Sequence, residues 1–394
     1  MIDDFNKLKI KMNKRKIAVI TGARADYGRM KSVLDAIKKH SELELCLIVT
    51  GIHLVPELGD TQKYIEEDGF KINEKVPMYT YEGDDGVVMA KSFAKCVEGM
   101  ADSFKKIKPD ICLVTVDRVE SLATAISAAF MNIPIAHIQG GEVTGTIDES
   151  IRHAITKMSH IHFPANEDAA NRIIKMGEDV RYVFMVGCPY MDIIHNLDYD
   201  SKENLVKEFN LNLSKPLVIF VQHPVTTEDE ESANNFLNTL EAIKKFNVNT
   251  VIIYPNIDAG GKRIIEKIKE QKIKYYSGLP FRKYLSLMKI ADIMIGNSSS
   301  GIREAPSFKL PAVNIGTRQQ GRLKAFNVID VGYSIEEITK GIEKALYDQK
   351  FKKQLQTCKN PYDPFEDGKS GEKITNILAT INLEKLSIQK KITY

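Results

Sequence analysis

The chain has 394 residues, too many for one ordinary hydrophobic core, and this length predicts two domains of about 150–200 residues each. Apolar residues make up 43% and charged residues 27%, as in soluble globular proteins, and the net charge of +3 gives no sign of a nucleic-acid groove or a membrane patch. No run approaches the ~18 apolar residues of a membrane span, and residues 1–16 lack the apolar stretch of a signal peptide.

The cysteines and histidines show no pattern typical of a metal site. The five cysteines are scattered and never spaced as Cys-x-x-Cys, which indicates free thiols in a reducing cytoplasm. The eight histidines include no His-Glu-x-x-His motif. We therefore expect a cytoplasmic protein without a disulfide framework or a metal cofactor.

Short β-branched runs alternate with helical patterns along the whole chain. In the first half, strands are predicted over residues 17–21, 43–49, 111–116, 133–138, 161–163 and 182–186, and a long amphipathic helix over 89–107. The second half continues with strands over residues 217–222, 251–254, 293–295, 312–315 and 328–331. Because strands and helices alternate, we expect parallel sheets with right-handed crossovers.

The polar stretch over residues 196–215 has no strand pattern and is the expected domain boundary. We predict two doubly wound domains that face each other across a cleft, with an N-terminal domain over 1–198 and a C-terminal nucleotide-binding domain over 199–370. Residues 371–394 are expected to form a helix and a basic tail that pack back on the first domain. Ligands of such sheets bind beyond the carboxyl ends of the strands.

The most informative segment is residues 140–153, which follows the apolar run 133–138. It combines glycines, hydroxyl groups, an arginine and a histidine with the carboxylates of Glu142, Asp148 and Glu149. Three acids so close together are unfavourable unless they bind a ligand or move protons. The segment therefore predicts the catalytic loop of an α/β enzyme.

Two other strand ends in the first half carry charged residues. Arg24 stands in the turn after residues 17–21, where a dinucleotide-binding fold would have glycines, so it is either solvated or available to a phosphate. Asp117 and Arg118 follow the strand 111–116. Asp117 is either a site residue or the N-cap of the next helix.

Strand ends of the second half carry polar groups as well. After residues 293–295, Ser298 and Ser299 lie in a loop rich in small residues, which is either an anion site at a helix N-terminus or a simple serine cap. Glu304, about one turn into that helix, is either a ribose ligand or a surface residue. Three further strand ends place His223, Asn256 and Arg318 on the same edge, with His223 either structural or catalytic.

Residues from about 17 to 346 resemble the hydrolysing UDP-N-acetylglucosamine 2-epimerases of sialic-acid-type sugar synthesis. The resemblance rests on seven motifs in the family's order: GARADYG, VDR, GGEVTGTIDESIRHAITK, QHPVTT, PNIDAG, GNSSSGIRE and GTRQ. The Gly-Gly-Glu form separates the chain from the non-hydrolysing epimerases. The resemblance implies the glycosyltransferase-B arrangement of two Rossmann-like domains, a nucleotide-sugar substrate, no cofactor and a homo-oligomer, either dimer or tetramer.

The resemblance also implies a reaction, in which UDP-N-acetylglucosamine and water give N-acetylmannosamine and UDP through a 2-acetamidoglucal. Asp117 and Asp148 match the family's catalytic acids, with Glu142 and Glu149 beside them, and His223 matches a residue near the diphosphate. The positions that match nucleotide contacts are Arg24, Arg118, Asn256, Ser298, Ser299, Glu304 and Arg318.

One position departs from the family, which commonly has a glutamate where this chain has Gln139. An amide cannot exchange protons, so we expect Gln139 to bind the sugar while Glu142 or Glu149 takes over the proton transfer. The alternative substrate is UDP- or GDP-linked N,N′-diacetylbacillosamine of the legionaminic acid pathway. A UDP-sugar glycosyltransferase and a non-catalytic nucleotide-sugar sensor are the alternatives from other functional classes.

Overall fold

The computed structural model describes residues 14–394 except 57–60, 82–84, 144–146, 226–227, 229, 256–260 and 272. The chain forms two compact units. The first runs to Ile193 and resumes at Asp367, and the second is Ile194–Glu366. The boundaries expected from sequence, 198/199 and 370/371, lie a few residues further along.

The first unit contains a parallel six-stranded sheet with the strand order β3-β2-β1-β4-β5-β6. Its strands are β1 (Arg15–Thr21), β2 (Leu43–Thr50), β3 (Ile72–Val76), β4 (Ile111–Thr115), β5 (Ile135–Ile138) and β6 (Ile161–Phe163). This is the order of a Rossmann fold, with the carboxyl ends of β1, β4 and β5 side by side. The topology therefore gathers the loops that carry Arg24, Asp117 and Glu142 at one edge.

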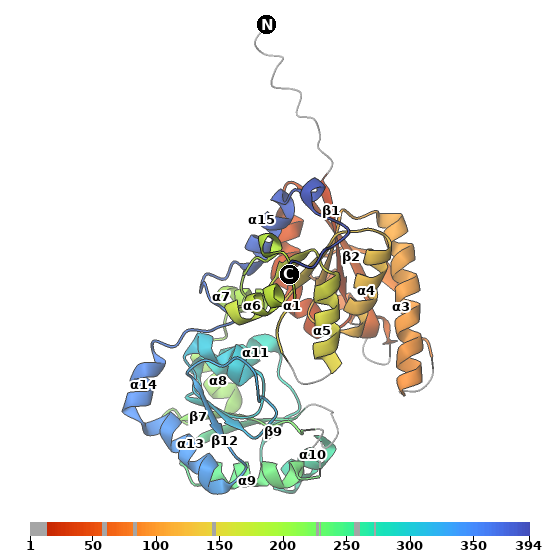
Figure 1. Ribbon diagram of the computed structural model, residues 1–394. Coiled ribbons are helices and arrows are strands. Elements are labelled where there is room, and N and C mark those ends of the chain that lie inside the picture. Colours follow the sequence, from red (N-terminus) through yellow and green to blue (C-terminus); the bar gives the residue numbers. More distant parts are fainter. Residues whose placement is uncertain are drawn as a thin grey trace. The chain divides into compact units, whose positions relative to one another are not determined.

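Helices cover both faces of this sheet (Figure 1). They are α1 (Arg24–Lys39), α2 (Gln62–Glu67), α3 (Gly86–Ile107), α4 (Val119–Phe130), α5 (Ile147–Met158), α6 (Glu167–Lys175), α7 (Pro189–Asn196, which crosses the unit boundary) and α15 (Ser370–Thr380). Successive residues of β1 point to opposite faces, so Val19 packs in the core under α1 and α15 while Ile20 packs under α3 and α4. None of the described helices is both long and apolar enough to cross a membrane.

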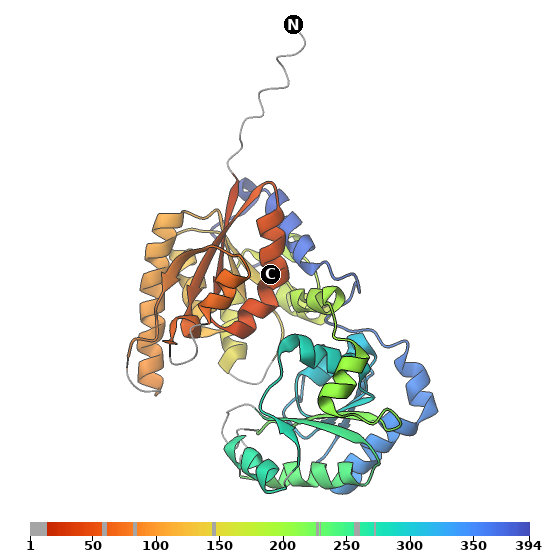
Figure 2. The same ribbon diagram turned by 180° about the vertical axis from the view of Figure 1, so that it is seen from behind.

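The end of the chain completes the first unit (Figure 2). Helix α15 lies against α1 and buries Ile374 and Leu378 in the core that α1 also covers. Asp192 caps α15, because its carboxylate accepts hydrogen bonds from the backbone N–H groups of Ser370 (2.9 Å) and Gly371 (2.7 Å). Beyond α15, the Lys390 ammonium donates to the Lys157 carbonyl (2.6 Å) at the end of α5.

The expected strand over residues 182–186 is not formed, and this prediction was wrong. The segment forms a 3₁₀ turn over Val180–Tyr182 and then a single bridge between Val183 and His162. The N–H group of Val186 still donates a hydrogen bond to the carbonyl of Pro164, the residue that follows β6. Since Pro164 has no N–H group to donate in return, the ladder ends there.

The second unit repeats the topology with the strand order β12-β11-β10-β7-β8-β9. Its parallel strands are β7 (Leu217–Val221), β8 (Asn249–Ile253), β9 (Tyr275–Tyr276), β10 (Ile293–Gly296), β11 (Ala312–Ile315) and β12 (Val328–Val331). The expected doubly wound parallel sheets are thus confirmed in both units. Adjacent strands β7, β10 and β11 carry His223, Ser298 and Arg318 just after their carboxyl ends.

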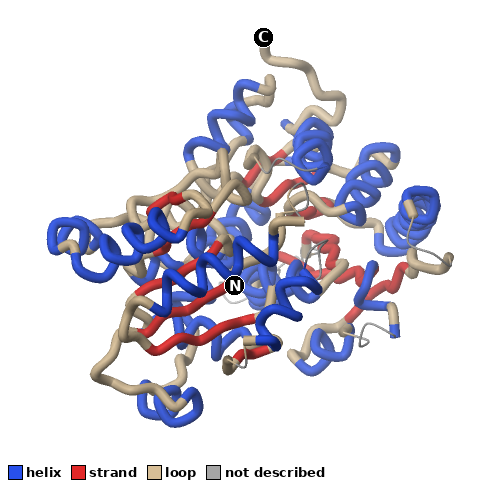
Figure 3. The backbone as a smooth tube through the Cα atoms, turned by 90° about the horizontal axis from the view of Figure 1, so that it is seen from below, coloured by secondary structure: helices blue, strands red, loops and turns tan. Residues whose placement is uncertain are grey.

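The helices of the second unit also pack on both faces of its sheet, and Figure 3 shows strands in red among helices in blue. They are α8 (Lys202–Phe209), α9 (Ser232–Lys244), α10 (Gly261–Glu270), α11 (Phe281–Ile290), α12 (Ser300–Arg303), α13 (Ile335–Tyr347) and α14 (Gln349–Leu355). Helix α12 has only four residues and passes into a 3₁₀ turn over Ala305–Phe308. Glu304 therefore stands at the end of a short helix and not within a longer one.

Candidate active site

Asp117 is held by a buried arginine of helix α5. The guanidinium of Arg152, whose side chain is only 2% exposed, forms an ion pair with the Asp117 carboxylate and donates to the Glu142 carbonyl (2.7 Å). The N-cap of α4 is Arg118, so Asp117 is not the cap that the sequence left open. Arg152 was not singled out from sequence, although it lies one helical turn after Asp148.

Burial raises the pKa of Asp117, and this effect exceeds the lowering by Arg152. The charge of Asp148 raises the pKa of Asp117 further, which places the two carboxyl groups within electrostatic reach of each other. Asp148 itself is exposed in the first turn of α5. The site thus contains a solvent-facing acid and a half-buried acid with a raised pKa, an arrangement suited to proton transfer.

The loop after β5 begins with two residues in the left-handed backbone region, Gln139 (φ 59°) and Gly141 (φ 79°). The buried Gln139 amide donates to Glu142 Oε1 (3.2 Å) and to Cys188 Sγ (3.3 Å). A Cβ atom on Gly141 would lie 2.4 Å from the Ala169 carbonyl oxygen, so only glycine fits there. Gln139 therefore orients the carboxylate of Glu142.

His137, which sequence reasoning missed, ties this loop to its neighbours. Its Nε2 donates to the carbonyl of Val116 (2.7 Å), a β-branched residue in the unusual left-handed region (φ 54°) just before Asp117. Burial lowers the pKa of His137 to about 3, so the ring is neutral and Nδ1 accepts from the Thr156 hydroxyl of α5 (3.2 Å). His137 thereby links the end of β4 to α5.

Glu149 lies beside Asp148 in the first turn of α5. Its Oε1 is 3.8 Å from His153 Nε2, one turn further along the helix. Both side chains are partly exposed. The structure thus brings Asp117, Glu142, Asp148 and Glu149 into one region of the first unit, as the sequence predicts, but leaves their individual roles as predictions.

A second charged cluster lies next to the first, at the ends of β1 and β4. The Nε–H of Arg118 contacts Glu120 Oε1 (2.9 Å) and Asp26 Oδ2 (3.3 Å). Neither acid was predicted as a site residue, although Asp26 belongs to the GARADYG motif and Glu120 follows VDR. Arg24 is exposed, with its guanidinium 5.1 Å from the centre of the Tyr64 ring, so it lies on the surface of the same loop.

In the second unit, Asn297 joins the loops after β7, β10 and β11. Its side-chain oxygen accepts the N–H of His223 (2.7 Å), and its amide donates to the His223 carbonyl (2.9 Å). The Asn297 carbonyl in turn accepts from Arg318 (3.1 Å) and Gln319 (2.8 Å). Gly296 (φ 123°) permits this approach, because a Cβ there would lie 2.0 Å from the Val221 carbonyl oxygen.

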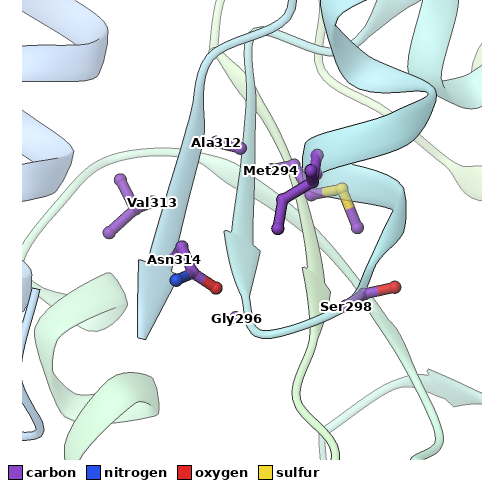
Figure 4. Close-up of a pocket in the computed structure, with 8 residues that line it drawn as sticks. Met294, Gly296, Ser298, Ala312, Val313 and Asn314 are labelled. Carbon is purple, nitrogen blue, oxygen red and sulfur yellow. The ribbon is translucent and has the colours of Figure 1, made fainter. Parts of the chain in front are cut away.

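Ser298, on the loop after β10, borders a pocket between β10, β11 and α12 (Figure 4). The pocket is mainly apolar, with Met294 and Ile302 in its wall and Asn314 at its edge. The Ser298 hydroxyl accepts the Ser300 N–H (3.3 Å), a local turn bond from the residue before the N-cap of α12. Ser299 is the N-cap of α12 but makes no capping bond with its side chain.

The second unit therefore brings together His223, Ser298, Ser299 and Arg318 at the carboxyl ends of adjacent strands. Glu304 is buried beside them at the end of α12. Asn256 lies outside the described residues. Asn297 and Gln319 were missed, and the only local signal for them was their place next to residues already selected.

The family resemblance implies that these loops bind UDP, and replacing Asn297 with serine is then expected to weaken this binding at least about tenfold and to lower the free energy of unfolding by about 1–3 kcal/mol. The reason is that the backbone N–H and C=O groups of His223 lose their partner. Calorimetric titration with UDP and urea denaturation measure the two effects. Asn204→Ser, on the exposed face of α8, is the control. Unchanged UDP affinity in Asn297→Ser would show that the loops keep their geometry without it.

Known proteins resemble this chain in sequence over most of its length. The sequence model of the family described as UDP-N-acetylglucosamine 2-epimerase matches residues 35–379. A Campylobacter jejuni protein named GDP/UDP-N,N′-diacetylbacillosamine 2-epimerase (hydrolyzing) is 38% identical over 351 residues, 86% of this chain and 90% of the relative. A Neisseria meningitidis UDP-N-acetylglucosamine 2-epimerase is 34% identical over 341 residues, 86% of this chain and 89% of the relative.

Solved structures show the same fold at lower sequence identity. A UDP-GlcNAc 2-epimerase from Neisseria meningitidis, crystallised with UDP-GlcNAc, superposes with a TM-score of 0.79 at 19% identity and covers 93% of this chain and 100% of its own. A UDP-GlcNAc 2-epimerase from Methanocaldococcus jannaschii, in complex with UDP-GlcNAc and UDP, gives a TM-score of 0.73 at 21% identity, covering 92% and 99%. At these identities the likeness concerns the fold alone.

Proposed function

Because this chain belongs to the UDP-N-acetylglucosamine 2-epimerase family, we propose that it is a hydrolysing 2-epimerase that converts UDP-N-acetylglucosamine and water to N-acetylmannosamine and UDP. The observation that carries this proposal is the acid cluster of the first unit. There, Arg152 holds Asp117 within electrostatic reach of Asp148. A glycosyltransferase of the same fold has no need for such a cluster.

The chemical difficulty of the reaction is that the sugar's C2 proton has no adjacent carbonyl group and is barely acidic. Cleavage of the C1–O bond solves this, because the resulting oxocarbenium-like state makes the C2 hydrogen removable and a 2-acetamidoglucal forms. Water then adds at C1 while a proton returns to C2 on the opposite face. The enzyme must therefore stabilise the departing diphosphate and supply groups that exchange protons.

We assign the proton transfers to the first unit. Asp148 transfers the proton at C2, and Asp117, whose pKa is raised by burial, is its partner. The Gln139 amide binds the sugar and orients Glu142, since it cannot exchange protons itself. Glu142 or Glu149 performs the proton transfer that an amide at position 139 cannot perform.

We assign nucleotide binding to the second unit, together with Arg24 and Arg118 of the first. His223 and Arg318 bind the diphosphate as hydrogen-bond donors, and Asn297 sets their positions. Ser298 and Ser299 contribute hydroxyl groups, while Glu304 and Asn256 bind the ribose or the base. No redox or metal group takes part in this scheme.

A second substrate is favoured by two of the relatives. The Campylobacter jejuni protein and a Legionella pneumophila protein, 35% identical over 384 residues, are both named for N,N′-diacetylbacillosamine. The two candidates differ in the groups at C4 and C6 of the sugar. We therefore expect the ratio of kcat/KM for the two UDP-sugars to identify the natural substrate.

Incubation with UDP-N-acetylglucosamine in deuterated water, followed by NMR of the sugar, tests the reaction. We expect N-acetylmannosamine with deuterium at C2, together with free UDP, because the returning proton comes from solvent. A product still linked to UDP contradicts hydrolysis. No turnover of this substrate, with turnover of UDP-N,N′-diacetylbacillosamine, assigns the chain to the second substrate.

We also propose that the protein acts in the cytoplasm as a homo-oligomer, a dimer or tetramer. The cytoplasmic assignment is supported by the cysteines, all of which are buried free thiols. The oligomer rests on the family resemblance. Light scattering of the purified protein measures the assembly, and a monomeric mass at working concentration contradicts it.

A further inference from the structure

Arg118 is held in an unusual way at the carboxyl edge of the first sheet. The carboxylates of Glu120 and Asp26 both contact its Nε atom, at 2.9 Å and 3.3 Å respectively. Among the residues that the structure describes, the one hydrogen bond of this side chain comes from Nε and goes to Glu120, and its two terminal nitrogens donate none. The side chain is 37% exposed, so part of it is accessible to a ligand.

The two acids are much more buried than the arginine between them. Glu120 is 1% exposed and Asp26 is 5% exposed. Glu120 cannot shift toward the β1 loop, because Gly22 packs directly on it and a Cβ there would lie 2.0 Å from Oε1. Its other oxygen, Oε2, has no hydrogen-bond partner in the described part of the chain. The Glu120 carboxylate therefore has Arg118 as its charged partner.

A guanidinium presents five N–H groups in a rigid plane, and its two terminal amino groups together match two oxygens of a phosphate. Carboxylates on the Nε side fix this plane while leaving the terminal groups available. A buried carboxylate is unfavourable without a charged partner. Two buried carboxylates beside one half-exposed arginine therefore indicate that the orientation of its guanidinium is important for binding a ligand.

We propose that Asp26 and Glu120 are positioning residues that hold Arg118 by its Nε–H, so that its terminal amino groups bind a phosphate of the nucleotide diphosphate. Only the identity of the ligand rests on the proposed function. The arrangement of the three side chains does not depend on it.

This arrangement couples phosphate binding to a proton. Burial raises the pKa of Asp26, and the nearby charges of Glu120 and Asp117 raise it further. The charges of Arg118 and Arg29 lower it. The net result is a pKa of about 6. A bound phosphate adds negative charge near Arg118 and raises this pKa further. Binding between about pH 6 and 7.5 is therefore accompanied by proton uptake on Asp26, and affinity falls as the pH rises through this range.

Calorimetric titration of the full-length protein with UDP, in buffers of different ionisation enthalpy, measures the protons taken up. We expect the wild type to take up a few tenths of a proton more than Asp26→Asn near pH 6.5. Proton changes of UDP itself occur with both proteins and cancel in this difference. Asp179→Asn, a partly exposed acid paired with Arg181, is the matched control and keeps the wild-type value.

Affinity measurements test the positioning itself. Arg118→Lys is expected to weaken UDP binding at least about tenfold, because a lysine cannot present the paired N–H groups. Glu120→Gln keeps the shape and is expected to weaken binding severalfold while reducing the proton uptake. Thermal unfolding confirms that each variant is folded, and the pH dependence of UDP affinity is compared between the wild type and Asp26→Asn.

The outcomes separate this inference from the proposed function. If the wild type binds UDP, but Asp26→Asn takes up as many protons and its affinity changes between pH 6 and 7.5 in the same way as that of the wild type, this inference alone fails. Wild-type affinity in Arg118→Lys overturns it as well. If the wild type neither binds UDP nor turns over a UDP-sugar, the ligand assignment and the proposed function fail together.

Discussion

Replacing Arg152 with methionine is expected to lower the free energy of unfolding by about 3–5 kcal/mol and to reduce turnover to the limit of detection. The guanidinium is buried and neutralises Asp117, and its removal leaves that half-buried carboxylate without its cation. The Glu142 carbonyl also loses a hydrogen bond. Because a methionine fills a similar volume, the loss reflects the charge and the hydrogen bonds more than a cavity.

Urea denaturation and steady-state kinetics measure these effects, and Arg181→Met is the control. Arg181 also pairs with an aspartate, but its side chain is 76% exposed, so little change is expected there. The double variant Arg152→Met/Asp117→Asn is expected to recover part of the stability and none of the turnover. If Arg152→Met alone keeps wild-type turnover, Asp117 does not depend on this pair.

The second large effect is expected for Asp148→Asn, which we predict to lower kcat by about 10²–10⁴-fold while leaving stability and UDP affinity nearly unchanged. A positioned proton-transfer group contributes a factor of this size. The side chain is exposed, so the isosteric amide disturbs no packing. Exchange of deuterium into C2 should fall together with kcat.

Glu167→Gln is the matched control, since Glu167 is an exposed acid in the first turn of another helix of the same unit. It is expected to behave as the wild type. Should Asp148→Asn retain turnover while Glu149→Gln loses it, the transfer at C2 belongs to the neighbouring acid. Loss of UDP affinity in Asp148→Asn would assign this residue to binding.

The sheets could be predicted because their signal is local. Most strands of both units are short apolar runs between helical patterns, and these are read directly from the chain. Strand β3 (Ile72–Val76) escaped because three of its five residues are polar, and β9 because it has two residues. Both lie at sheet edges, where a strand pairs with one neighbour only and needs fewer apolar residues.

The positions of the candidate acids were predictable for a similar reason, since they follow strands at a common edge. Their partners were not. Arg152 and His137 are distinguished only by the partners that the fold places next to them. Arg152 pairs with the carboxylate of Asp117, and His137 donates to the carbonyl of Val116. Likewise, Asn297 acquires its role by reaching the loop after β7, which is more than 70 positions away in sequence.

The expected helix after Ser299 illustrates the opposite error. Serines and glycines at a strand end favour a helix start, and a helix does begin at Ser300, but it lasts four residues. Pro306 lies in the first turn of the following 3₁₀ segment and cannot continue an α-helical ladder. A helix this short has a weak dipole, so it supports the anion site expected from the sequence less than a longer helix would.

Helix α15 has a consequence for how the protein is made. The first unit is interrupted in sequence, and its core beside α1 stays uncovered until Ile374 and Leu378 have been added. The second unit is continuous and has all of its strands at an earlier stage. On the ribosome, the half that begins the chain is therefore completed last, with apolar surface open to chaperones while the other half folds.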